Sequence, residues 1–113
     1  MPRDYRLYLE DMSASLRRLQ TLTAGMSYDE FAADPTKQEA VIHNLEIIGE
    51  ASRNVPQAVR LTYPDVDWAG IASLRNILIH EYFGIDLEII WDIIQNELPI
   101  LDAQIKKIFS DLR

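Results

Sequence analysis

Apolar residues recur along this chain at intervals of three and four positions, which is the spacing of an amphipathic helix. The pattern covers residues 4–22, 35–54, 68–83 and 86–112. No segment shows the strict alternation of apolar and polar residues that marks a half-buried strand. The pattern therefore predicts an all-α chain with four long helices.

Short-range signals mark where these helices begin and end. Ser and Asp before a helical run can accept hydrogen bonds from the free N–H groups of the first turn. Pro35 suits the first turn of a helix because it has no N–H to donate, and Gly25 suits a left-handed helix end. A short turn is expected over 57–61, and Pro99 should kink or split the last helix. The expected N-caps are Ser27, Asp34, Asp67 and Asp86.

Short connections between long helices predict an antiparallel bundle of four to five helices, forming one domain over residues 1–113. The segments 68–83 and 86–112 carry more apolar surface than one partner face requires. That surplus predicts a homodimer formed through these helices. A wide core face in a small bundle would produce the same pattern.

Composition limits the setting in which the chain works. It has 113 residues, no cysteine and a net charge of −7. The absence of cysteine favours the reducing cytoplasm and excludes thiolate metal sites. No apolar run has the length of a signal peptide core or a membrane span. Because nucleic-acid binders usually carry basic surfaces, RNA could be bound only in a local cationic cleft or with a partner's help.

The segment 75–83 combines apolar packing with reactive side chains. On a helical wheel, Arg75 falls in the middle of the apolar arc of its helix. A guanidinium cannot be left unpaired in an apolar interior. Arg75 therefore reaches a carboxylate, a subunit boundary or a cleft that binds an anion. An internal pair with Asp or Glu, or a head group that reaches solvent, is the structural alternative.

The polar side of the same helix carries Ser73, Asn76 and His80. Asn76 and His80 are four residues apart, so Asn76 can orient the imidazole. The helix C-terminus and the neighbouring Glu81 favour the imidazolium form, which suits a general acid or a phosphate-binding cation. His80 could also act only as a favourable C-terminal residue. Arg75 and His80 point about 140° apart on a regular helix, so they can converge only if the helix end distorts or if two copies face each other.

Other constellations indicate no further chemistry. His43, Glu46 and Glu50 share one face of their helix, but a solvated polar face explains them better than a metal site. The chain has no phosphate-binding glycine loop and no Gly-x-Ser-x-Gly sequence. We expect neither a metal nor a cofactor.

Arg75-Asn76, three intervening residues and His80-Glu81-Tyr82 together resemble the signature of the HEPN-domain ribonucleases. The version Arg-x4-His-x-Tyr resembles the HepT-like branch of that family. Further likeness covers nearly the whole chain, in the segments 47–51, 64–68, 80–84 and 91–99.

This resemblance implies an all-α bundle that dimerises through the motif helices. It also implies a metal-independent endoribonuclease toxin that cuts tRNA or mRNA by attack of the 2′-hydroxyl. Arg75 would stabilise the charged phosphorane, His80 would act as acid or base, and Asn76 would support them, with Ser73 and Glu81 nearby. An MNT-type nucleotidyltransferase antitoxin would block the toxin by transferring AMP to Tyr82.

Two alternatives to a ribonuclease remain open from the residues alone. A non-catalytic helical module that binds a nucleotidyltransferase or a nucleotide would carry the same signature. A purely structural bundle would satisfy Arg75 with an internal carboxylate. In either case Tyr82 would be a core aromatic residue at the end of the apolar stripe.

Overall fold

The structure is a computed structural model that describes residues 4–80 and 86–112, with the backbone alone for 75–80. Every regular element in these ranges is helical. In chain order they are α1 (Tyr5–Thr23), α2 (Tyr28–Ala32), α3 (Pro35–Arg53), α4 (Gln57–Thr62), α5 (Trp68–His80), α6 (Leu87–Asp92), the π-helix η1 (Ile93–Glu97) and α7 (Leu98–Asp111).

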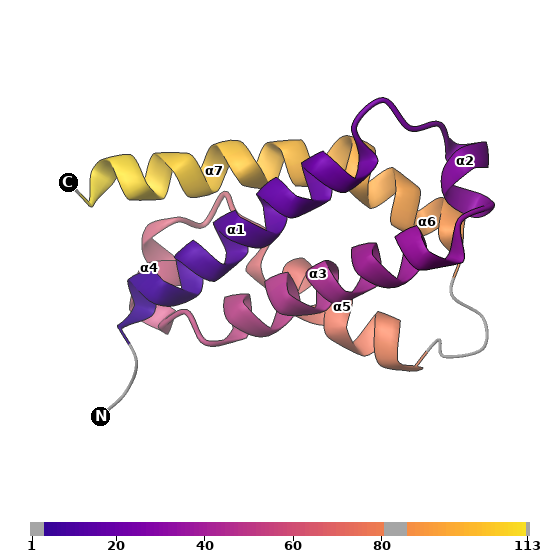
Figure 1. Cartoon of the computed structure of the whole chain (residues 1–113). Helices are drawn as coiled ribbons and strands as arrows, with labels where there is room; N and C mark the ends of the chain where they lie inside the picture. The colour runs from indigo at the N-terminus through magenta and orange to yellow at the C-terminus, as the bar shows by residue number, and fades with distance from the viewer. Residues whose placement is uncertain (1–3, 81–85, 113) are drawn as a thin grey trace.

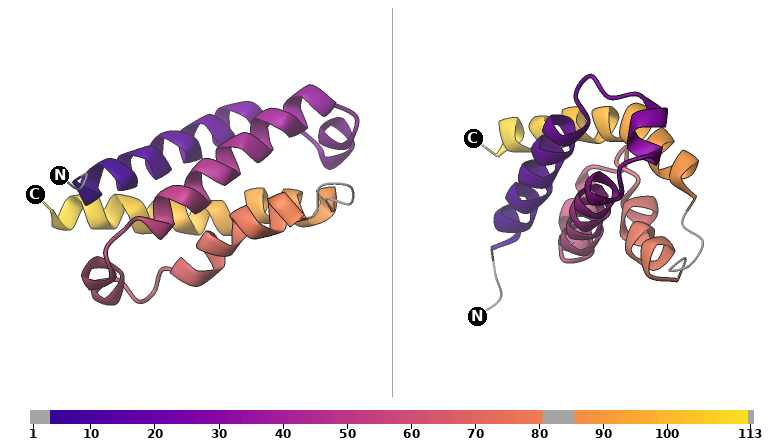
Figure 2. Two further views of the ribbon diagram at one scale, coloured as in Figure 1. Left: turned by 90° about the horizontal axis from the view of Figure 1, so that it is seen from below. Right: turned by 45° about the vertical axis from the view of Figure 1, so that its right-hand side comes forward.

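The long helices α1, α3 and α5 and the continuous run α6–η1–α7 alternate in direction (Figure 1). α3 lies between α1 and α5, and α7 packs against α1 (Figure 2). The short helices α2 and α4 sit at opposite ends of the bundle (Figure 1). The prediction of an all-α antiparallel bundle is confirmed.

The core forms where the apolar faces of α1, α3 and α7 meet. The predicted stripes are largely buried, because three-and-four spacing places their side chains on one side of each helix. Ile89 is the exception: it belongs to the apolar pattern of 86–112, but it is 53% exposed. Buried members include Leu9, Met12, Leu16, Leu19, Val41, Leu45, Ile48, Leu101, Ile105 and Ile108.

The predicted helix starts are confirmed by hydrogen bonds. Ser27 and Glu30 form a reciprocal capping box, in which each side chain accepts from the backbone N–H of the other. The carboxylate of Asp34 accepts from the N–H of Lys37, and that of Asp86 accepts from the N–H of Glu88. Gly25 has a φ of +69°, which confirms the left-handed end of α1.

The last helix contains a wider, π-helical turn just before Pro99. Because proline lacks an N–H, it removes one hydrogen bond from the helical ladder. The helix continues past it, with the five residues Ile93–Glu97 wound as a π-helix immediately before α7. The predicted kink or split is thus a local unwinding, since the apolar contacts of Ile94 and Leu98 keep both parts on the core.

The structure bears on two expectations only over the residues that it describes. The helix predicted over 68–83 is confirmed as far as His80, and its last positions lie outside the described residues. Among the described helices, none is long and apolar enough to cross a membrane.

The core account predicts a large difference between two isoleucines of one helix. Ile105 is 1% exposed, whereas Ile100 is 60% exposed. Ile105→Ala should lower the free energy of unfolding by about 2–5 kcal/mol, because it removes buried methyl groups and leaves a cavity. Ile100→Ala should change it by about 0.5 kcal/mol or less. Urea unfolding followed by circular dichroism measures both, and equal losses would contradict the assigned core.

Candidate functional site

The helix α5 carries the predicted motif. Contacts of the N-terminal half of α5 with the core fix the position of this helix. Trp68 and Leu74 are buried and belong to the core cluster. The indole N–H of Trp68 donates to the backbone oxygen of Tyr63 at 3.0 Å, which satisfies its polar atom. α5 packs against α3 along its length, so the two helices hold a fixed relation.

The first turn of α5 is closed by Asp67. Its Oδ1 accepts a hydrogen bond from the N–H of Gly70 at 3.0 Å, as the sequence predicted for a cap. A Cβ atom at position 70 would collide with the Asp67 carboxylate. Glycine therefore allows the carboxylate to fold over the helix end, and a larger residue would displace it.

Ser73 is the one predicted site residue whose side chain is described. It is half-buried, and its hydroxyl donates to the backbone oxygen of Gly70 at 2.6 Å. This contact uses the hydroxyl proton within the helix itself. In this geometry the Ser73 side chain bonds to the backbone of its own helix. Its supporting role at the site stays a prediction.

The remaining motif residues fall at or beyond the limit of the description. The backbone of α5 runs through Arg75, Asn76 and His80, while their side chains lie outside the described part. Glu81 and Tyr82 also lie outside the described residues. Their predicted roles therefore remain predictions.

An aromatic cluster anchors α6, the element that follows 81–85 in the chain. Phe31 and Trp91 stack with ring centroids 5.3 Å apart, and Tyr28 meets Trp91 edge-on at 6.4 Å. Burial raises the pKa of the Tyr28 hydroxyl, and the nearby Glu88 and Asp86 carboxylates raise it further. The cluster ties α2 to α6, so the described elements on both sides of 81–85 have defined anchors.

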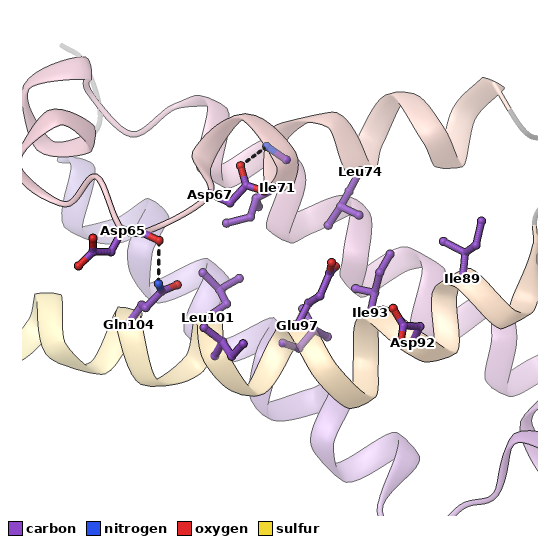
Figure 3. A pocket seen from close by; sticks show the side chains of 13 residues that line it. Asp65, Asp67, Ile71, Leu74, Ile89, Asp92, Ile93, Glu97, Leu101 and Gln104 are labelled. Atoms are coloured by element: carbon purple, nitrogen blue, oxygen red, sulfur yellow. Dashed lines mark hydrogen bonds between the residues drawn. The ribbon is translucent and has the colours of Figure 1, made fainter.

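A pocket of about 420 Å³ opens between the first half of α5 and the run α6–η1–α7 (Figure 3). Its lining combines isoleucine and leucine side chains with four acids, namely Asp65, Asp67, Asp92 and Glu97. Sequence reasoning missed this pocket, because its acids come from two separate parts of the chain, the loop before α5 and the run α6–η1. No group of three or more His, Cys, Asp or Glu residues within the described ranges could hold a metal ion.

The chain was compared with known protein families and with individual proteins. A family model described as ribonuclease HepT-like matches residues 12–108, a range that includes all of α5. The chain belongs to this family. The resemblance carried by the motif is thereby confirmed.

Individual relatives agree along almost their whole length. A protein of Methanocaldococcus jannaschii named a "putative RNase" is 44% identical, over 99% of this chain and 93% of its own. A "probable ribonuclease HepT" of Thermococcus cleftensis is 35% identical, over 96% of this chain and 98% of its own. A further "putative RNase", from Caldanaerobacter subterraneus, is 42% identical, over 93% and 94%. No solved structure matches the chain.

The cap of α5 can be tested with two substitutions at one position. Asp67→Ala removes the acceptor for the Gly70 N–H and should lower the free energy of unfolding by about 1 kcal/mol. Asp67→Asn keeps a side-chain oxygen and should lose less than half of that. Chemical denaturation measures the difference. If alanine and asparagine were equally stable at this position, the cap would not hold α5 in place.

Proposed function

We propose that this chain is a metal-independent endoribonuclease of a toxin–antitoxin pair, active as a homodimer. The observation that carries the proposal is the family match over residues 12–108, a range that contains every residue of the motif. The relatives' names add support, because each describes a ribonuclease over nearly the full length shared with this chain.

The reaction needs no metal, because the RNA supplies its own nucleophile. The 2′-oxygen attacks the adjacent phosphorus, and the bond from phosphorus to the 5′-oxygen breaks. The products are a 2′,3′-cyclic phosphate and a free 5′-hydroxyl. One group must take the 2′-hydroxyl proton and another must protonate the leaving 5′-oxygen.

The motif residues have the chemistry for each of these tasks. Arg75 offers a permanently charged fork of donors that suits the extra negative charge of the phosphorane. An imidazole can accept or donate a proton near neutral pH, so His80 suits either role. Asn76, one helical turn before His80, would hold the imidazole in the required orientation.

The spacing of the same residues supports the proposed dimer. Five positions of a regular helix separate Arg75 from His80, which corresponds to about 140° around the axis. One copy therefore contributes them in different directions. Two copies related by a two-fold axis would place an Arg and a His from each in a shared groove, where the two histidines serve as base and acid.

Control by an MNT-type nucleotidyltransferase antitoxin would act on Tyr82. The phenol oxygen would attack the α-phosphorus of ATP, forming a tyrosyl-AMP and releasing pyrophosphate. The added group is bulky and carries a negative charge beside the arginine's site. It would block RNA from the groove and offset the positive charge of Arg75.

The chain's two histidines provide a matched test of catalysis. His80→Ala should reduce cleavage of a fluorescently labelled RNA by about 100-fold or more, because proton transfer is lost. Arg75→Ala should reduce it by a similar factor through lost charge stabilisation. His43→Ala, on the exposed face of α3, should cleave like the wild type. EDTA should leave the wild-type rate unchanged.

The same assay separates catalysis from a binding role. Circular dichroism first establishes that each variant is folded. Unchanged cleavage in folded His80→Ala and Arg75→Ala would remove these residues from the mechanism. No cleavage by the wild type, with binding to a nucleotidyltransferase retained, would identify the chain as a binding module.

Modification of Tyr82 can be followed by intact-mass measurement. The protein co-expressed with an active MNT-type nucleotidyltransferase should gain the mass of one or more adenylyl groups and lose RNA cleavage. Tyr82→Phe lacks the attacking oxygen and should gain none. Equal adenylylation of the wild type and Tyr82→Phe would place the modification on another residue.

A further inference from the structure

The pocket beside α5 has an apolar floor and an acidic rim. Its floor comes from both walls, with Ile71 and Leu74 on α5 facing Ile93 and Leu101 across the opening (Figure 3). Ile100 also lines it and is 60% exposed, as is Ile89 at 53%. Exposed aliphatic side chains around a hollow of this size are typical of an interaction surface.

The acids of the rim have no basic partner within the described part of the chain. Among the lining residues that the structure describes, four are acids and none is Lys or Arg. Lys106, further along α7, pairs with Asp102 at 2.9 Å. Local hydrogen bonds involve neutral groups: Asp67 accepts from the Gly70 N–H, and Asp92 accepts from the Asn96 side chain at 2.6 Å. Counted over residues 4–74 and 86–112, whose side chains are described, the rim is therefore a local concentration of negative charge.

This charge decides between possible occupants. RNA is a polyanion, and the rim would repel it. The two-fold contact expected for the motif involves the second half of α5, whereas a second copy docked in this pocket would bring two identical acidic rims together, which is unfavourable. A partner with positive charges beside apolar side chains would satisfy both the rim and the floor.

The shape of the pocket selects the form of that partner. The wall of the pocket formed by α6–η1–α7 extends from Ile89 to Gln104, which corresponds to about 22 Å of helix. Glu97, in the π-helix, projects from this wall towards α5 (Figure 3). An amphipathic helix laid in a groove presents apolar anchors at three-and-four spacing, with flanking charges on either side.

We propose that the pocket between α5 and α6–η1–α7 docks a cationic amphipathic helix of a partner protein. Its leucine- or isoleucine-like side chains enter the apolar floor, and its Lys or Arg residues meet Asp65, Asp92 and Glu97. The proposal stands on the pocket's lining and charge. It does not require the ribonuclease reaction, so either can fail without the other.

A synthetic peptide of lysine and leucine, about 18 residues long and helical in pattern, serves as the probe. Fluorescence anisotropy of the labelled peptide measures its affinity for the full chain. The double variant Asp92→Asn/Glu97→Gln should bind about tenfold more weakly, with two charge pairs lost. Glu10→Gln/Glu39→Gln removes the same net charge from exposed sites on α1 and α3 and should bind like the wild type.

The apolar floor is tested separately with Ile100→Ala, which should weaken binding by about threefold to tenfold through lost buried area. A second peptide with glutamate in place of lysine should not bind. Equal losses in the two double variants would reduce the effect to net charge and overturn the proposal. Binding of the glutamate peptide would do the same. So would a change in self-association on sedimentation for the pocket variants, because it would assign the surface to a second copy.

Discussion

The packing of α5 against α3 is the constraint on which the site depends. Trp68 and Leu74 bury the first half of α5 in the core, and the carboxylate of Asp67 closes its first turn on Gly70. These contacts precede Arg75 directly in the chain. The backbone that carries Arg75, Asn76 and His80 is thus the continuation of a helix whose origin is held by burial and a cap. A shift of that origin would rotate every motif residue about the helix axis.

Local rules predicted most of the fold, because helix starts and stripes depend on neighbours within one or two turns. Ser27, Asp34 and Asp86 cap as expected, and Gly25 ends α1 in the left-handed region. The exposure of Ile89 was not predicted, since it depends on which helices face α6 in the folded chain. The form of the distortion before Pro99 was also not predictable, because neighbouring core contacts decide whether a helix breaks or unwinds.

For the candidate site too, the part that depends on local spacing was predicted and the part that depends on the tertiary fold was not. The motif residues were predicted from their spacing and their roles stay predictions, while the family match covers the range 12–108 in which they lie. The acidic pocket was not predicted from the sequence, because Asp65 meets Asp92 and Glu97 only in the folded chain. Its position also bears on the net charge of −7. Part of that charge is gathered beside the pocket, where it would direct RNA away from this face of the bundle.

The chemistry of the RNA ends tests the central claim most directly. An RNA with a single cleavage site should yield a 2′,3′-cyclic phosphate and a 5′-hydroxyl, identified by mass spectrometry. The same RNA with a 2′-deoxy nucleotide on the 5′ side of the cleaved bond should remain intact, because its nucleophile is missing. Cleavage of the deoxy-substituted RNA at an equal rate would contradict the account.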